Sequence, residues 1–298
     1  MPWEAATAAD ARRSLADLFV APEEPIPVGA VQERDVPIDG TRVRTRIFTP
    51  EGEGTFPILL WFHGGGWVVG SLEESDTVCR SLCARTGAIV VCPDYRMAPE
   101  HRFPVAVEDC YALTAWAAEA GPSFGGDPSR IAVAGDSAGG NLAAAVALMA
   151  RDRSGPRLVF QALVYPVLGM PDDGRPSYDA FAEGLFLTRH GMEWFAEQYL
   201  GGPVDARNPY LVPLRAEDLA GLPPALILTA EYDPLRDEGE EYARRLEADG
   251  TPCTLSRYAG MIHAFFVLPD QFDDAVRAHE QVAGALREAF AAPARVTA

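Results

Sequence analysis

The hexapeptide GDSAGG, residues 135–140, contains the residue best suited to chemistry, Ser137. It lies between a strand-like apolar run, residues 131–134, and an alanine-rich, helix-like run, residues 141–150. A serine at a tight turn from a strand into a helix takes a strained backbone conformation, which small neighbouring residues permit. A GxSxG string alone also fits an ordinary glycine-rich turn, but the strand and helix around it favour a nucleophile. The sequence therefore predicts that Ser137 presents its hydroxyl for attack on a substrate.

A serine nucleophile needs a base to accept its proton and a carboxylate to orient that base. His263, in the segment YAGMIHAFF, directly follows the last predicted strand, where a packed core histidine is the alternative. Asp233 follows the apolar run ALILTAEY and precedes a predicted helix, which is where α/β proteins bind ligands. Asp237 and Glu231 are the competing acids, and surface charge or helix capping is the simpler role for either. We predict a triad of Ser137, His263 and Asp233.

The segment HGGGW, which begins at His63, directly follows the apolar run ILLWF. Its glycines leave backbone N–H groups free to face a substrate oxygen, and each such donor contributes about 3 kcal/mol to transition-state stabilisation. A plain turn or a phosphate-binding loop is the alternative, but the sequence has neither a following GKS or GKT nor a GxGxxG spacing. We expect the N–H groups of Gly65, Gly66 and Ala138 to form an oxyanion hole, with His63 in a structural role.

These residues require a framework, and the sequence predicts an α/β fold in which helices cover both faces of a mostly parallel sheet. In residues 41–48, Val43, Thr45 and Ile47 alternate with arginines, which predicts a half-exposed strand at an edge of the sheet. The other predicted strands are residues 57–62, 88–92, 130–134, 158–165, 225–229 and 252–258. The predicted helices are residues 74–86, 105–119, 138–150, 236–248 and 271–290.

Two regions interrupt this alternation, residues 1 to about 40 and an insertion of about residues 170–215. In the insertion, LTRHGMEWFAEQYL predicts an amphipathic helix with Thr188 as its N-cap and the pair Gly201 and Gly202 as its stop. We expect the two regions to form a cap, because ligands of open α/β sheets bind beyond the carboxyl ends of the strands. Four aromatic residues are predicted to bind substrate: Trp67, Phe181, Phe186 and Trp194. The competing explanation is that they pack within the cap.

The composition fits one α/β domain of 298 residues. Apolar residues make up 48% of the chain, but no run approaches the roughly 20 apolar residues of a membrane-spanning helix. The first residues lack the basic segment and apolar core of a secretory signal, so we expect a soluble, cytoplasmic protein. A net charge of −18 argues against nucleic acid as a partner. The five cysteines are scattered and predict neither a zinc site nor a disulfide framework.

Five motifs together resemble the hormone-sensitive lipase family of α/β-hydrolases, known in bacteria as family IV esterases: HGGGW, DYRMAPEHRFPVAVED, GDSAGG, EYDPLRDEG and GMIHAF. They span nearly the entire chain, and the order Ser, Asp, His is that of the α/β-hydrolases. The resemblance implies a helical cap and the hydrolysis of small-molecule carboxylic esters without a metal or other cofactor. It also implies Ser137, Asp233 and His263 as the triad, and it leaves a homodimer open.

Other functions fit parts of this pattern. A trypsin-like protease has a similar GDSGG string, but it is an all-β protein whose histidine and aspartate precede the serine. A peptidase or amidase on the present fold stays chemically open. A plant hormone receptor that resembles this family has lost the histidine, whereas His263 and Asp233 are both present here. We predict a serine carboxylesterase for short- to medium-chain esters that works through an acyl-enzyme intermediate.

Overall fold

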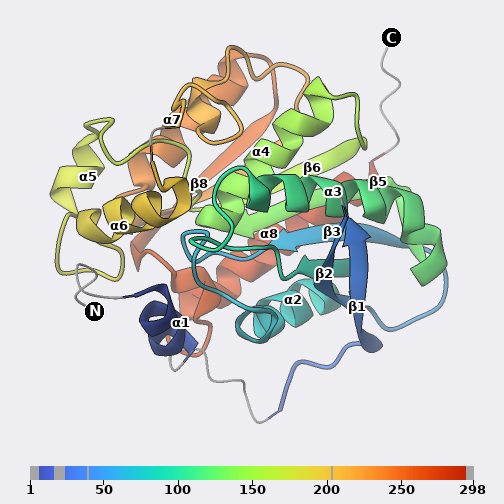
Figure 1. The fold of residues 1–298 in the computed structure, drawn as a ribbon. Coiled ribbons are helices and arrows are strands. Elements are labelled where there is room, and N and C mark those ends of the chain that lie inside the picture. The colour runs from blue at the N-terminus through green and yellow to red at the C-terminus, as the bar shows by residue number, and fades with distance from the viewer. Residues whose placement is uncertain (1–6, 17–23, 39, 203, 293–298) are drawn as a thin grey trace.

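An eight-stranded sheet runs through the centre of the molecule (Figure 1). Its strands are β1 Ala30–Ile38, β2 Thr41–Thr49, β3 Phe56–Phe62, β4 Ile89–Pro93, β5 Gly126–Asp136, β6 Leu158–Val164, β7 Ala225–Tyr232 and β8 Cys253–Ile262. The computed structural model describes residues 7–16, 24–38, 40–202 and 204–292. The strand order is β1-β2-β4-β3-β5-β6-β7-β8, in which β2 pairs antiparallel with β1 and β4 and all other pairs are parallel. The predicted α/β fold with a mostly parallel sheet is confirmed.

Helices cover both faces of the sheet. They are α1 Ala8–Ala16, α2 Leu72–Thr86, α3 Val105–Ala120, α4 Ala138–Asp152, α5 Pro176–Ala180, α6 Arg189–Leu200, α7 Arg236–Ala248 and α8 Asp273–Ala291, with short 3-10 turns at Gly121–Phe124, Pro213–Arg215 and Phe265–Val267. Within the described part of the chain, none of these helices has the length and apolarity needed to cross a membrane.

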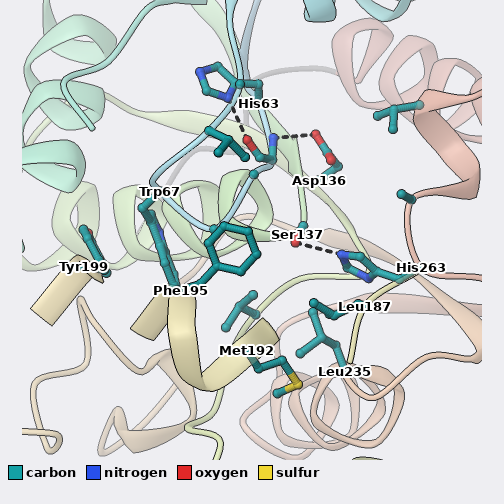
Figure 2. A pocket seen from close by; sticks show the side chains of 18 of the residues that line it. His63, Trp67, Asp136, Ser137, Leu187, Met192, Phe195, Tyr199, Leu235 and His263 are labelled. Carbon is teal, nitrogen blue, oxygen red and sulfur yellow. Dashed lines mark hydrogen bonds between the residues drawn. The ribbon is translucent and has the colours of Figure 1, made fainter. Parts of the chain in front are cut away.

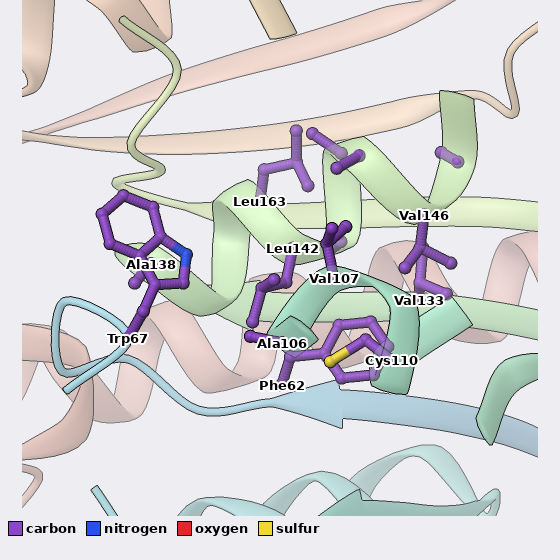
Figure 3. Packing of buried hydrophobic residues seen from close by; sticks show 14 of the residues in the cluster. Phe62, Trp67, Ala106, Val107, Cys110, Val133, Ala138, Leu142, Val146 and Leu163 are labelled. Carbon is purple, nitrogen blue, oxygen red and sulfur yellow. The ribbon is translucent and has the colours of Figure 1, made fainter. Parts of the chain in front are cut away.

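Alternating side chains in β3 explain why the sheet is covered on both sides. Leu60 and Phe62 belong to a buried cluster with α3, α4 and α7, whereas Leu59 and Trp61 belong to a second cluster with α2 and α8. Figure 3 shows part of the first cluster, with Phe62 of β3 and Cys110 of α3 among its labelled side chains. Because both faces of the central strands are apolar, each face has to be buried under helices.

The edge of the sheet differs from the prediction. The expectation that residues 41–48 form an edge strand was wrong, because β1 pairs with the whole length of β2 and β2 lies between β1 and β4. The predicted alternation in β2 is confirmed, since Val43, Thr45 and Ile47 are all buried. Residues 30–38 thus belong to the sheet and not to a cap. Most side chains of β1 are exposed and several are charged, as is common in edge strands, so no buried apolar pattern marked this strand.

The insertion between β6 and β7 contains α5 and α6, which lie with α1 at one end of the sheet (Figure 1). The Thr188 hydroxyl accepts the N–H of Gly191 at 3.0 Å and caps α6, which ends at Gly201 in a left-handed conformation. Both ends of α6 match the prediction. Residues 1–6, 17–23, 39 and 203 of the predicted cap lie outside the described residues.

The five cysteines are free thiols, and four of them are buried. Burial raises the pKa of the Cys83 thiol to about 12, so this group stays protonated at neutral pH. The same cause raises the pKa of Cys253 to about 12.

Candidate active site

Ser137 lies at the turn between β5 and α4, with φ 55° and ψ −118°. A positive φ is uncommon for a residue with a Cβ, and such strain is found mostly at functional sites. The Ser137 N–H donates to the Val164 carbonyl at 2.9 Å, which holds the turn against β6. The turn requires small residues, because a Cβ at Gly135 or Gly139 would overlap the Phe62 carbonyl. The strained turn that the sequence predicts is therefore present.

A hydrogen-bonded chain joins Ser137 to His263 and His263 to Asp233. Ser137 Oγ lies 2.9 Å from His263 Nε2 (Figure 2), and His263 Nδ1 lies 2.7 Å from Asp233 Oδ2. All three side chains are buried. An ionised carboxylate only accepts hydrogen bonds, so Nδ1 donates to Asp233 and Nε2 accepts from the serine hydroxyl. The residues follow the ends of β5, β7 and β8, and the parallel sheet thus brings together at one edge two groups 126 positions apart in the chain.

The two competing acids have other partners. Asp237 accepts the Ser177 N–H at 2.9 Å and forms an ion pair with Arg236. Glu231 accepts the N–H of Gly260 at 2.7 Å. Of the three candidate acids, the structure brings Asp233 to the imidazole.

The HGGGW loop follows β3 and borders the same cavity as Ser137. Gly65 and Gly66 have φ angles of 104° and 58°, and a Cβ at Gly65 would overlap the Val69 carbonyl. Ala138 is the first residue of α4, so its N–H has no acceptor within the helix. The structure therefore places Gly65 and Gly66 in the lining of the cavity that Ser137 also lines, and Ala138 directly after Ser137 in the chain.

Two buried side chains hold the glycine loop in place. Asp136 Oδ1 accepts the Gly64 N–H at 2.9 Å, and burial raises the pKa of this carboxyl to about 6. His63 Nδ1 lies 2.7 Å from the Gly64 carbonyl, and its ring stacks on Tyr95 with the centroids 4.4 Å apart. Burial lowers the pKa of His63, so the neutral ring donates to this carbonyl. Asp136 was not among the predicted site residues, although its position directly before Ser137 was a usable signal.

The cavity beside Ser137 has a volume of about 130 Å³ and a mostly apolar lining. Of the predicted substrate-binding residues, Trp67 and Phe186 belong to this lining. Trp67 stacks on Tyr199 of α6 with the ring centroids 4.4 Å apart, so the HGGGW loop packs directly against the insertion.

The other two predicted substrate-binding residues lie outside the lining of this cavity. Phe181 packs edge-on against Tyr232, with the ring centroids 5.8 Å apart. Trp194 is buried and packs edge-on against Phe195, with the centroids 5.1 Å apart. For these two aromatic residues, packing describes the structure better than substrate contact.

The face of α6 that lines the cavity was not predicted, because it includes Phe195 and not the neighbouring Trp194. Met192, Phe195, Ala196 and Tyr199 line the cavity, and their spacing of three or four residues defines one face of the helix. One position along a helix rotates the side chain by about 100°, so Trp194 faces elsewhere. Figure 2 shows Met192, Phe195 and Tyr199 on the α6 side of the pocket. Helical spacing groups these four residues on one face of α6, but it does not indicate which face of the helix meets the cavity.

Comparison with known proteins places the chain among hydrolases. A family model described as alpha/beta hydrolase fold matches residues 59–267. The carboxylic ester hydrolase LipN of Mycobacterium tuberculosis is 45% identical over 244 residues, which cover 80% of this chain and 65% of that protein. The carboxylesterase NlhH of the same species is 43% identical over 269 residues, covering 87% of this chain and 83% of that protein.

A solved structure supports the same family. The crystal structure of EstE1, a thermophilic carboxylesterase cloned from a metagenomic library, has a TM-score of 0.91 at 41% identity and covers 96% of this chain and 99% of its own. The family match includes the glycine loop, Ser137, Asp233 and His263. The chain therefore belongs to the α/β-hydrolase fold family, in its hormone-sensitive lipase-like branch, the bacterial family IV.

Proposed function

We propose that the chain is a carboxylic ester hydrolase in which Ser137 is the nucleophile, His263 the general base and Asp233 the orienting carboxylate. The observation that carries this proposal is the buried chain of hydrogen bonds, 2.9 Å from Ser137 Oγ to His263 Nε2 and 2.7 Å from Nδ1 to Asp233 Oδ2. The choice of an ester substrate is supported by the names of the relatives LipN and NlhH, a carboxylic ester hydrolase and a carboxylesterase.

In the first half of the reaction, the Ser137 oxygen attacks the ester carbonyl carbon while its proton passes to His263 Nε2. The carbonyl oxygen becomes an oxyanion, to which the N–H groups of Gly65, Gly66 and Ala138 donate hydrogen bonds. Each donor contributes about 3 kcal/mol to stabilising this charge. When the intermediate collapses, the bond to the alcohol oxygen breaks, and the alcohol takes the proton from His263.

The second half repeats these steps with water. His263 removes a proton from a water molecule, whose oxygen attacks the acyl carbon bound to Ser137. The same three N–H groups hold the second oxyanion. Collapse breaks the acyl bond, the acid is released, and the proton returns from His263 to the Ser137 oxygen. Asp233 stabilises the charged imidazole in both halves.

Short- to medium-chain esters suit the size of the cavity. Its volume of about 130 Å³ is on the order of ten single-water volumes of about 10–15 Å³ each. Leu15 of α1 and Met192 of α6 both line it, which supports a cap built on a single domain from the N-terminal region and the insertion. Trp67 and Phe186 supply aromatic wall for an acyl or alcohol group.

The proposal is tested by hydrolysis of 4-nitrophenyl esters from acetate to dodecanoate. We expect turnover by the wild-type protein, with the highest kcat/KM at short or medium chains. Ser137→Ala should lower kcat by about 10⁴- to 10⁶-fold, because it removes the nucleophile and leaves the oxyanion hole. Circular dichroism establishes that both proteins are folded. Absence of turnover by folded wild-type protein, or full activity of Ser137→Ala, would overturn the assignment.

A further inference from the structure

We infer that the active-site cavity selects esters by charge, accepting neutral and cationic substrates and disfavouring anionic ones, and that Glu74 is the specificity-determining residue. This inference rests on the proposed ester hydrolysis and adds a substrate class to it. It depends on the charges that line the cavity and on the partners of the Glu74 carboxylate.

The lining of the cavity carries negative groups without a fixed positive one. Among its described residues are the carboxylates Asp136 and Glu74 and no arginine, and the sequence has no lysine. Of the two lining histidines, His63 has a pKa lowered by burial and is neutral. The other, His263, is bonded to Asp233 and is the proposed base. The charge on the cavity wall that has no counter-ion is therefore negative.

Glu74 lies in the first turn of α2, and the neighbouring Ser75 and Val78 also line the cavity. Burial raises the pKa of the Glu74 carboxyl, so this group is partly withdrawn from water. Within the described residues no ion pair joins this carboxylate to an arginine, and the negative charges of Glu73 and Asp94 raise its pKa further. A partly desolvated carboxylate without a counter-ion attracts a cation and repels an anion more strongly than an exposed one does.

The adjacent carboxylate Glu73 is a natural control. It is exposed and lies outside the lining of the cavity. Arg44 and Arg46 bind it at 3.2 Å and 3.0 Å, so its charge is already compensated. Glu73 and Glu74 differ by one position and carry the same charge, but only Glu74 lines the cavity. An effect of net charge alone would appear on neutralising either residue, whereas a site effect would appear only at Glu74.

Glu74 also has a local structural role that the test has to separate from specificity. Its N–H donates to the Ser71 hydroxyl at 3.2 Å, and that hydroxyl also interacts with the Glu74 carboxylate. The cap itself is the hydrogen bond from the Glu74 backbone N–H, and glutamine keeps a side-chain oxygen that accepts from the Ser71 hydroxyl. The substitution Glu74→Gln therefore removes the charge and keeps the cap.

The same wall has a consequence for the reaction products. Hydrolysis of a neutral ester releases a carboxylate, and this anion forms in a cavity lined by Asp136 and Glu74. Repulsion favours its departure, so we expect weak inhibition by the acid product. A free carboxyl group elsewhere on the substrate meets the same repulsion before reaction.

The experiment compares matched esters at pH 8 with wild-type protein, Glu74→Gln and Glu73→Gln. The acyl series is 4-nitrophenyl pentanoate, mono-4-nitrophenyl glutarate and 4-nitrophenyl 4-(trimethylammonio)butanoate. The alcohol series is the butanoates of 3,3-dimethylbutanol, glycolic acid and choline, followed by titration of released acid. The two series test both sides of the scissile bond. Thermal unfolding of each variant reports on the helix cap.

In at least one series, we expect Glu74→Gln to lower the cationic-to-neutral ratio of kcat/KM about tenfold and to raise the anionic-to-neutral ratio by a similar factor. Glu73→Gln should leave both ratios within about twofold of wild type. Unchanged ratios for Glu74→Gln in both series, or equal shifts for the two variants, would overturn the inference. Failure of the ester-hydrolase proposal looks different, because the wild-type protein would then turn over neither neutral ester, and the inference would fall with it.

Discussion

At the residue scale, Asp233 and Asp136 are two buried carboxylates near His263 with different tasks. Asp233 bonds the imidazole directly at 2.7 Å, whereas Asp136 bonds the Gly64 N–H at 2.9 Å and so fixes the glycine loop. Replacing either acid by asparagine keeps the shape of the side chain and removes the charge. The consequences should differ, because only Asp233 needs to be an acceptor for a ring N–H.

We expect Asp233→Asn to lower kcat about 10⁴-fold with little change in fold. The amide nitrogen can donate to Nδ1, which favours the imidazole tautomer with its proton on Nε2 and leaves no acceptor for the Ser137 hydroxyl. Steady-state kinetics with 4-nitrophenyl butanoate and far-ultraviolet circular dichroism measure the two quantities. A loss of less than tenfold would show that Asp233 does not orient His263.

We expect Asp136→Asn to change how stability depends on pH. The pKa of Asp136 is raised by burial from 3.8 to about 6, so the folded chain holds this proton when the unfolded chain has lost it. The free energy of unfolding therefore falls as pH rises from about 4 to 6, by about 3 kcal/mol for a two-unit shift. Asparagine still accepts from Gly64 but has no proton to lose, so the variant should avoid this loss.

Urea unfolding at pH 4 and pH 7.5 measures this difference. Relative to the wild type, the stability of Asp136→Asn should rise by about 2–3 kcal/mol between the two pH values. A difference that stays constant with pH would mean that the Asp136 carboxyl titrates normally. The comparison is made within each protein, so a fixed cost of the substitution cancels.

At the element scale, the function of a helix or loop depends on which of its faces meets the cavity. The ends of α6 were predictable because Thr188 and Gly201 give local signals for capping and termination. Its cavity face was not, because Phe195 and Trp194 are equally apolar and only tertiary packing distinguishes them. The edge strand β1 was not predicted for a similar reason. Most of its side chains are exposed, and the backbone pairing with β2 that makes it a strand leaves no pattern in the sequence.

Phe186 and Phe181 provide a matched pair for testing the wall of the cavity. Phe186→Ala removes aromatic lining, so we expect kcat/KM for octanoate relative to butanoate esters to change by about 3- to 10-fold, on the scale of one or two methylene contacts. Phe181→Ala removes a ring that packs on Tyr232 outside the lining, so this ratio should stay constant. Equal changes in the two variants would show that the cavity does not set chain length.

At the scale of the whole molecule, the site was the most predictable part of the structure. Each predicted triad residue directly follows a strand, and parallel strands place such positions at one edge of the sheet, so sequence order and spacing were sufficient. Asp136 and Glu74 were beyond this reasoning, because their importance depends on which way a side chain faces from a turn or a helix. Residue positions fixed by the backbone were predictable, whereas contacts fixed by side-chain packing were not.

The excess of acidic groups should make the fold sensitive to salt. The chain has 43 acidic and 25 basic side chains, and its net charge of −18 at pH 7 opposes compaction. Its exposed ion pairs, such as Arg12 with Glu100, are worth about 0–1 kcal/mol each and lose this contribution in salt. We expect self-repulsion to dominate, so 0.5 M NaCl should raise Tm at pH 8 by about 2–5 °C relative to 10 mM NaCl.

The control for this effect is the same salt scan at pH 5. The isoelectric point is near 4.6, so the net charge is small at pH 5 and the stabilisation should largely disappear. A fall in Tm with salt at pH 8 would show that ion pairs outweigh repulsion. An equal rise at both pH values would indicate a salt effect unrelated to charge.

The distance of 126 positions between Ser137 and His263 also sets an order of events during synthesis. At roughly 5–20 residues per second, the serine leaves the ribosome about 6–25 s before its base. Until β8 joins the edge of the sheet next to β7, the Ser137 hydroxyl has no proton acceptor and is no more reactive than any other serine. On the proposed mechanism, a growing chain therefore cannot hydrolyse esters before β8 is in place. Esterase activity in a cell extract would count only chains that have been completed and fully folded.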